Sequence, residues 1–151
     1  MPDKPRLLIT RKLTDAVLMR AARDYDVTVN ADDHVFATNE LIAKCQDVDA
    51  VLPCHSEHFS ADVISALPKR LKIIANHSVG VDHVDLVAAK DAGVVVTNTP
   101  DVLSDATAEI AMLCMLGAAR RGAEGDAMIR AGKWDFWSPA FMVGRQVTGK
   151  R

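Results

Sequence analysis

Short, nearly continuous apolar runs alternate with helical segments over the first hundred residues, and this alternation is the strongest constraint on the fold. Strands that are apolar on both faces are typical of a parallel sheet between two layers of helices. The pattern therefore predicts a small doubly wound α/β domain with five strands. The expected strands cover residues 6–10, 27–30, 50–52, 71–75 and 94–97, and the expected helices cover 16–23, 39–45, 60–67 and 84–92.

Polar residues and glycines mark the expected ends of these helices. Thr14 and Asp15 offer a cap for the first helix, because short polar side chains accept the free amides of a helix N-terminus. Asp82 stands where it could cap the helix over 84–92, and Gly93 suits the end of that helix.

Beyond residue 100 the pattern changes to helices without strands. Ser104 or Asp105 can cap a long helix through Arg121, and residues 110–119 are apolar nearly all round. Such a helix requires burial on several sides. Gly122 and Gly125 are expected to loosen the chain before a second helix over 127–130, closed at Gly132.

Charge and cysteine content exclude several classes of protein. The 18 basic and 20 acidic side chains are evenly mixed, which predicts neither nucleic-acid binding nor attraction to a membrane surface. The longest uncharged apolar run, between Glu109 and Arg120, is about half the ~20 residues of a membrane span. The N-terminus lacks the apolar core of a secretory signal. Three widely spaced cysteines without a C-x-x-C pair favour a reduced, cytoplasmic compartment.

The loops after the predicted strands are the expected ligand sites, because open α/β sheets bind ligands beyond the carboxyl ends of their strands. The candidate loops are 11–13, 53–57 and 76–82. In the third, Gly80 is expected to permit a backbone conformation that other residues resist, and successive N–H groups can bind an anion. This loop would suit a small carboxylate or phosphate. The alternative is a tight turn without a ligand.

The histidines and Cys54 admit other interpretations. His55 and His58 lie three residues apart, but no third ligand is in view, which favours a solvated or capping role over a metal site. His77 and His83 flank the Gly80 turn and could titrate near a bound carboxylate or serve the structure. Cys54 and His55 are adjacent at a strand end and should point to opposite sides, which argues against a thiolate pair. Neither G-x-G-x-x-G nor G-x-x-x-x-G-K-[ST] occurs in the chain.

Several segments, in order, closely resemble the D-isomer-specific 2-hydroxyacid dehydrogenases, most of all their glyoxylate/hydroxypyruvate reductase branch. They are N-H-S-V-G-V-D-H-V-D at 76–85, D-A-G-V-V-V-T-N-T-P at 91–100, D-A-T-A-E at 105–109 and A-R-R at 119–121. The resemblance implies a flavodoxin-like substrate domain over residues 1–100, completed by a final C-terminal helix. It also implies that residues 101–151 open a Rossmann cofactor domain and carry much of a homodimer interface.

The same resemblance implies roles for single residues. Val79 and Gly80 match the backbone amides that hold the substrate carboxylate, and Val79 also borders the cofactor. Thr107 matches a residue near the nicotinamide of NAD or NADP. Trp137 matches an aromatic residue that reaches the partner's substrate pocket.

The loop at 54–56, with Cys54 and His55, occupies a substrate-facing position of the family. The family's dinucleotide fingerprint and its catalytic arginine, glutamate and histidine would lie beyond Arg151. No catalytic residue and no metal ligand is therefore expected within these 151 residues.

Two interpretations follow from this resemblance. The first is the N-terminal portion of an NAD(P)-dependent enzyme that interconverts small 2-keto acids and D-2-hydroxy acids, with the 151-residue chain inactive by itself. The second is a naturally short, non-catalytic dimerising or regulatory module. The identities at Val79, Gly80, Thr107 and Trp137 favour the first.

Overall fold

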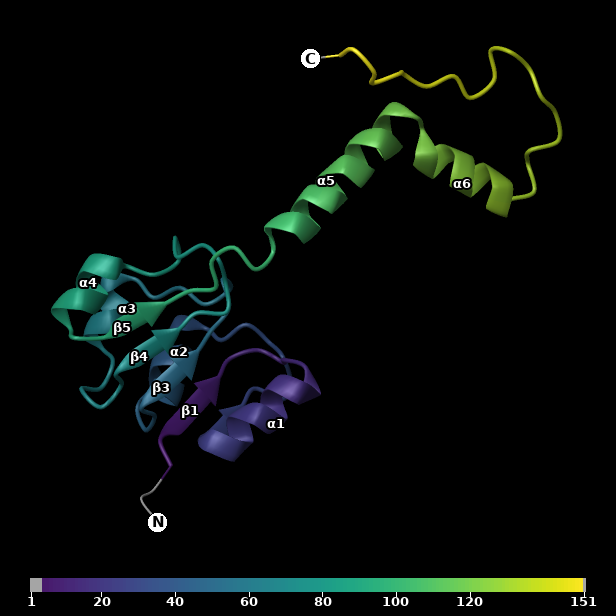
Figure 1. Ribbon diagram of the computed structural model, residues 1–151. Helices are drawn as coiled ribbons and strands as arrows, with labels where there is room; N and C mark the ends of the chain where they lie inside the picture. Colours follow the sequence, from purple (N-terminus) through teal and green to yellow (C-terminus); the bar gives the residue numbers. More distant parts are fainter. Residues whose placement is uncertain (1–3, 151) are drawn as a thin grey trace. The chain divides into compact units, whose positions relative to one another are not determined.

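The computed structural model describes residues 4–150 and divides the chain into two compact units (Figure 1). The first unit is Met1–Asp101 and the second is Val102–Arg151. The first unit holds the sheet and four helices, and the second holds two helices and an irregular C-terminal stretch.

The sheet of the first unit has five parallel strands in the order β2-β1-β3-β4-β5. This is the flavodoxin-like strand order, whose direction of winding reverses between β1 and β3. The predicted five-stranded parallel sheet is therefore confirmed. The strands are β1 (Arg6–Ile9), β2 (Asp26–Val29), β3 (Ala50–Leu52), β4 (Ile73–Ala75) and β5 (Val95–Thr97).

Helices cover both faces of this sheet (Figure 1). Helix α1 (Asp15–Asp24) packs on the face that contains Leu7 and Ile9. Helices α2 (Thr38–Cys45), α3 (Ala61–Ser65) and α4 (Leu86–Asp91) enclose a larger core on the opposite face, around Leu8. The expectation that all strands are buried on both faces is wrong for the edge strands: every residue of β2 is exposed or half-buried, and Val95 in β5 is 57% exposed.

The helix ends of the first unit follow the expected chemistry at some positions and not at others. Asp85, not Asp82, caps α4, and its carboxylate accepts two backbone amides of the first turn. Thr14 precedes α1, but its hydroxyl makes no capping bond. Gly93 follows α4 with φ of +70°, as expected for a helix end.

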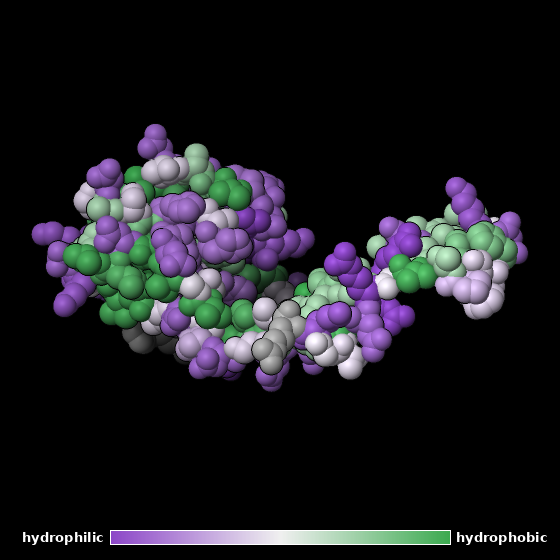
Figure 2. Space-filling view, turned by 90° about the horizontal axis from the view of Figure 1, so that it is seen from above, coloured by the Kyte–Doolittle hydropathy of each residue, from purple (hydrophilic) through white to green (hydrophobic). Residues whose placement is uncertain are grey.

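In the second unit, α5 (Ser104–Ala119) exposes its apolar side chains. Neither Ser104 nor Asp105 caps the helix, because Leu103 occupies the capping position. No residue of α5 is buried, and Ile110 and Leu113 are 59% and 64% exposed. Green, hydrophobic residues accordingly lie at the surface of this unit (Figure 2). The predicted burial of this helix does not occur within the chain, and exposed apolar surface of this kind marks an interaction site.

Helix α6 (Gly122–Arg130) begins five residues earlier than predicted and contains both Gly122 and Gly125. The chain breaks instead at Arg121, whose φ of +57° is in the left-handed region. Gly132, at φ +63°, follows the helix as expected. Within residues 4–150, no helix is long and apolar enough to cross a membrane.

Candidate functional site

The loops that follow β1, β3, β4 and β5 are joined by hydrogen bonds at the carboxyl edge of the sheet. The Thr10 hydroxyl, after β1, reaches the loop after β3. The His77 amide, after β4, donates to the Pro53 carbonyl after β3 at 2.8 Å. The Thr99 amide, after β5, also binds the loop after β4. This edge includes the β1/β3 switch point, where the fold favours ligand binding.

Three consecutive carbonyl groups of the turn after β4 accept hydrogen bonds from other parts of the first unit, whereas two of its amides are unpaired within the described residues. The amides of Val79 and Gly80 donate no hydrogen bond to any residue in 4–150, and both residues are exposed. Unpaired, successive N–H groups at a surface form an anion-binding concavity. The three consecutive carbonyl oxygens each accept one bond: Ser78 from the Thr99 amide at 3.0 Å, Val79 from Asn98 Nδ2 at 2.9 Å and Gly80 from Asn76 Nδ2 at 2.9 Å.

Gly80 does not have the backbone conformation that its residue type suggested. The described glycines with left-handed φ are Gly93, Gly132 and Gly149, so the expectation of an unusual angle at Gly80 is wrong. A Cβ atom at Gly80 would instead lie 3.2 Å from the Asp82 carboxylate. The absence of a side chain therefore keeps space open at the turn.

His83 supports this turn from the core side. It is buried, and its Nε2 lies 3.0 Å from Asn76 Oδ1. Because Asn76 Nδ2 donates to Gly80, Oδ1 must be the acceptor and His83 the donor. Burial lowers the pKa of His83, and His58 and His55 lower it further, against the opposite effect of Asp82 and Glu57. His83 thus has a structural role, whereas His77 is exposed.

Glu57 is a buried carboxylate that joins the loops after β1 and β3. It is 1% exposed. Its Oε2 accepts bonds from the Thr10 hydroxyl at 2.8 Å and the Cys54 amide at 3.1 Å, and its Oε1 accepts from the Ser56 hydroxyl at 3.0 Å. Arg11 also donates to Ser56 Oγ at 3.2 Å. The sequence analysis included Glu57 in the candidate loop 53–57 but predicted no role for it.

Cys54 contacts the β4 loop rather than its neighbour His55. Its Sγ lies 3.8 Å from His77 Nδ1. Burial raises the pKa of the Cys54 thiol, and the Glu57 charge raises it further, so the group is a thiol at neutral pH. His55 and His58 are both exposed. No cluster of three metal-ligating side chains occurs among the residues that the structure describes.

Thr107 and Trp137 both belong to the second unit, while the other predicted site residues belong to the first. Thr107 is exposed in the first turn of α5. Trp137 is 77% exposed and lines a cavity of about 280 Å³ with Trp134 and Phe141.

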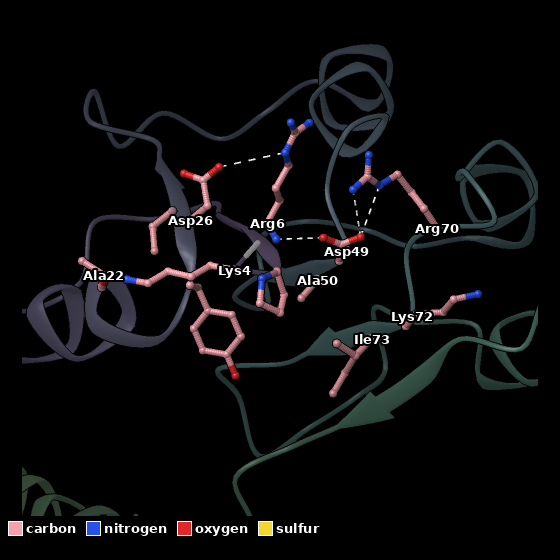
Figure 3. Close-up of a pocket in the computed structure, with 12 residues that line it drawn as sticks. Lys4, Arg6, Ala22, Asp26, Asp49, Ala50, Arg70, Lys72 and Ile73 are labelled. Carbon is pink, nitrogen blue, oxygen red and sulfur yellow. Dashed lines mark hydrogen bonds and ion pairs between the residues drawn. The ribbon is translucent and has the colours of Figure 1, made fainter. Parts of the chain in front are cut away.

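A cavity of about 1230 Å³ lies at the opposite, amino-terminal edge of the sheet (Figure 3). Four of its charged side chains form two ion pairs, and its two lysines donate to backbone carbonyls. The pairs are Arg6 with Asp26 at 3.9 Å, Arg70 with Asp49 at 2.9 Å, Lys4 with the Ala22 carbonyl at 2.9 Å and Lys72 with the Lys69 carbonyl at 2.6 Å.

Comparison with known proteins connects this chain to one family. Residues 7–141 match the model of the D-isomer specific 2-hydroxyacid dehydrogenase catalytic domain. A glycerate dehydrogenase from Hyphomicrobium methylovorum is 42% identical over 98% of the chain and 46% of its own length. A glyoxylate reductase from Thermococcus onnurineus is 40% identical over 97% of the chain and 45% of its length. The chain thus spans about half the length of the curated relatives it matches.

Solved structures show the same relationship. A protein from Polaromonas sp. JS6 66 has a TM-score of 0.88 and 39% identity, over 97% of this chain and 46% of its own. An NADPH-dependent glyoxylate/hydroxypyruvate reductase from Sinorhizobium meliloti, solved with NADP and malonate, has a TM-score of 0.71 and 29% identity, over 87% and 40% of the two chains. The matched domain, the parallel sheet and these relatives together show that the chain belongs to the D-isomer specific 2-hydroxyacid dehydrogenase family.

Proposed function

We propose that this chain supplies the carboxylate-binding part of an NAD(P)-dependent oxidoreductase that interconverts small 2-keto acids and D-2-hydroxy acids. The observation that carries the proposal is the pair of exposed, unpaired amides at Val79 and Gly80. Two N–H groups in succession can bind the two oxygens of a carboxylate. The glycerate dehydrogenase and glyoxylate reductase relatives, and the malonate bound to the Sinorhizobium meliloti reductase, support a small carboxylic acid as the ligand.

The residues of this chain position a substrate but do not fit a nicotinamide cofactor by themselves. The chain has no glycine-rich phosphate fingerprint. The two residues of this chain that are expected beside the cofactor, Val79 and Thr107, are both exposed. The cofactor, where bound, supplies hydride transfer. The part played by this chain is to hold the carboxylate and keep the Cys54–His55 loop beside it.

We also propose that the second unit forms a homodimer interface. The exposed apolar face of α5 and the exposed Trp137 support this role. The same observation favours a second candidate function, a naturally short dimerising or regulatory module without catalysis. The free thiols of Cys45, Cys54 and Cys114 fit the reduced, cytoplasmic compartment proposed for either function.

Two measurements test the function. Titration of the ¹⁵N-labelled chain with oxamate, an unreactive 2-keto acid analogue, should shift the Val79 and Gly80 amide resonances, while sodium chloride at matched ionic strength should not. Equal shifts with both salts would remove the carboxylate site. The mass of the protein in its source cells separates the two candidate functions, because a mass that corresponds to 151 residues would refute the longer enzyme.

A further inference from the structure

The three consecutive carbonyls of the β4 turn determine where three amides point. In a trans peptide, the carbonyl of one residue and the N–H of the next lie in one plane and point in opposite directions. A donor that binds a carbonyl therefore holds the following N–H pointing away from that donor. The described part of the chain contains no cis peptide bond that would break this relation.

Each fixed carbonyl corresponds to one amide. The bond to Ser78 O orients the Val79 N–H, and the bond from Asn98 to Val79 O orients the Gly80 N–H. The bond from Asn76 to Gly80 O orients the Val81 N–H. The amide of Val81, like those of Val79 and Gly80, donates to no residue in 4–150.

The two asparagines differ in how firmly they are held. Asn76 is 2% exposed, and its Oδ1 receives the bond from buried His83. The His83 carbonyl in turn accepts the amide of fully buried Phe59 at 2.7 Å. Asn98 is exposed and donates to Val79 O from the end of β5. The turn is thus hydrogen-bonded to a buried side chain, Asn76, and to a side chain at the end of β5, Asn98.

We propose that Asn98 and Asn76 are positioning residues that orient the Gly80 and Val81 amides, respectively, so that the carboxylate site comprises three consecutive amides at 79–81. The inference rests on the proposed function, since it takes the ligand to be a carboxylate at this turn. It adds the Val81 amide to the site and assigns the orientation of two amides to two particular side chains. Neither asparagine touches the ligand.

The test compares single-residue effects within one turn. Oxamate is titrated into the ¹⁵N-labelled 151-residue chain and into the Asn98→Ala and Asn76→Leu variants, with sodium chloride at matched ionic strength as the salt control. We expect Asn98→Ala to raise the Kd for oxamate about tenfold, the equivalent of one hydrogen bond, and to reduce chiefly the Gly80 shift when oxamate is extrapolated to saturation. Asn76→Leu should reduce chiefly the Val81 shift.

Two further variants separate an effect local to position 98 from the effect of an added charge elsewhere on the chain, and unfolding measurements separate both from loss of folding. Asn98→Asp replaces the donor with an acceptor beside Val79 O and should weaken oxamate binding more than Asn98→Ala. Asn39→Asp, the same change at an exposed position of α2, should leave the Kd unchanged. The midpoint of urea unfolding is measured for each variant, and because Asn98 is exposed, Asn98→Ala should fold even if Asn76→Leu does not.

Each outcome is decisive. If the wild-type chain binds oxamate and the variants bind equally well, or if all three amides have equally reduced shifts at saturating oxamate, the positioning roles are refuted while the carboxylate site stands. If the wild-type chain shows no shift beyond that caused by sodium chloride, the proposed function fails and this inference fails with it. Separate losses, at Gly80 in Asn98→Ala and at Val81 in Asn76→Leu, support the inference.

Discussion

Removal of the Glu57 carboxylate should destabilise the first unit strongly, whereas replacement by glutamine should be nearly neutral. In Glu57→Ala, the fully buried Thr10 hydroxyl and the half-buried Cys54 amide lose their acceptor. A buried donor without a partner costs about 1–3 kcal/mol. One fully buried donor and one half-buried donor therefore predict a loss of about 2–4 kcal/mol in the free energy of unfolding.

Glutamine at position 57 can reproduce all three contacts. Its carbonyl oxygen can accept from Thr10 and Cys54, as Oε2 of Glu57 does. Its amide can donate to Ser56 Oγ, because a hydroxyl has two lone pairs and Arg11 occupies only one of them. We therefore expect Glu57→Gln to cost less than about 1 kcal/mol, within the range of a single net hydrogen bond.

The assay must report the first unit alone, because the two units can unfold separately. Urea unfolding followed through the amide resonances of β1 and β3 meets this requirement. Glu40→Ala is the matched control, since Glu40 forms only a partly exposed pair with His34, worth less than about 1 kcal/mol. Equal costs for Glu57→Ala and Glu57→Gln, or a cost for Glu57→Ala as small as that of Glu40→Ala, would refute the reasoning.

Four further predictions concern the turn, the pH dependence and the second unit. Gly80→Val should raise the Kd for oxamate about tenfold, the equivalent of one hydrogen bond, because the added side chain would crowd the Val79 and Gly80 amides; an unchanged Kd in the NMR titration would contradict this. Because burial lowers the pKa of folded His83 below the usual 6.5, the unfolded chain binds more protons just below pH 6.5, and the free energy of unfolding should rise with pH through that window. A His83→Gln variant should flatten this slope in urea titrations. Leu113→Glu, on exposed α5, should reduce self-association in analytical ultracentrifugation, and an unaltered sedimentation profile would argue against an α5 interface. The 151-residue chain should show no NAD(P)H-dependent reduction of glyoxylate, and turnover that copurifies with it would overturn the assignment of catalysis to residues beyond Arg151.

The strands were predictable because a central strand of a parallel sheet is apolar on both faces. The bounds of β3 match the prediction, β1 differs from it by one residue at one end, and β2 differs by one residue at each end. Helix α6 was not predictable from its glycines. Gly93 and Gly122 both come shortly after the last residue of a helix, yet Gly93 stands in the loop that ends α4 and Gly122 begins α6. The left-handed residue between α5 and α6 is Arg121, at a cost of about 1–2 kcal/mol that packing can offset.

The site was predictable at the level of loops and not at the level of contacts. The position of the loops follows from strand order, and the sequence places residues 53–57 and 76–82 correctly beyond β3 and β4. The partners come from other strands: Thr10 for Glu57, and Asn98 for Val79. Hydrogen bonds between loops that are far apart in the sequence produce no periodic pattern from which they could be predicted. Burial is equally hard to predict from neighbouring residue types, since His58 is exposed and the adjacent Glu57 is buried.

The two units differ in how many of their apolar side chains are buried within the chain. This difference decides which of the proposed roles can be tested on the 151-residue chain. In the first unit, residues such as Leu8, Val51 and Ile74 are enclosed within the unit, so the turn after β4 stands on a packed core. In the second unit, no residue of α5 or α6 is buried. Carboxylate binding can therefore be measured on the 151-residue chain. The roles proposed for Thr107 and Trp137 involve a bound cofactor and a partner subunit, so their test requires an assembly in which the exposed apolar side chains of α5 are covered.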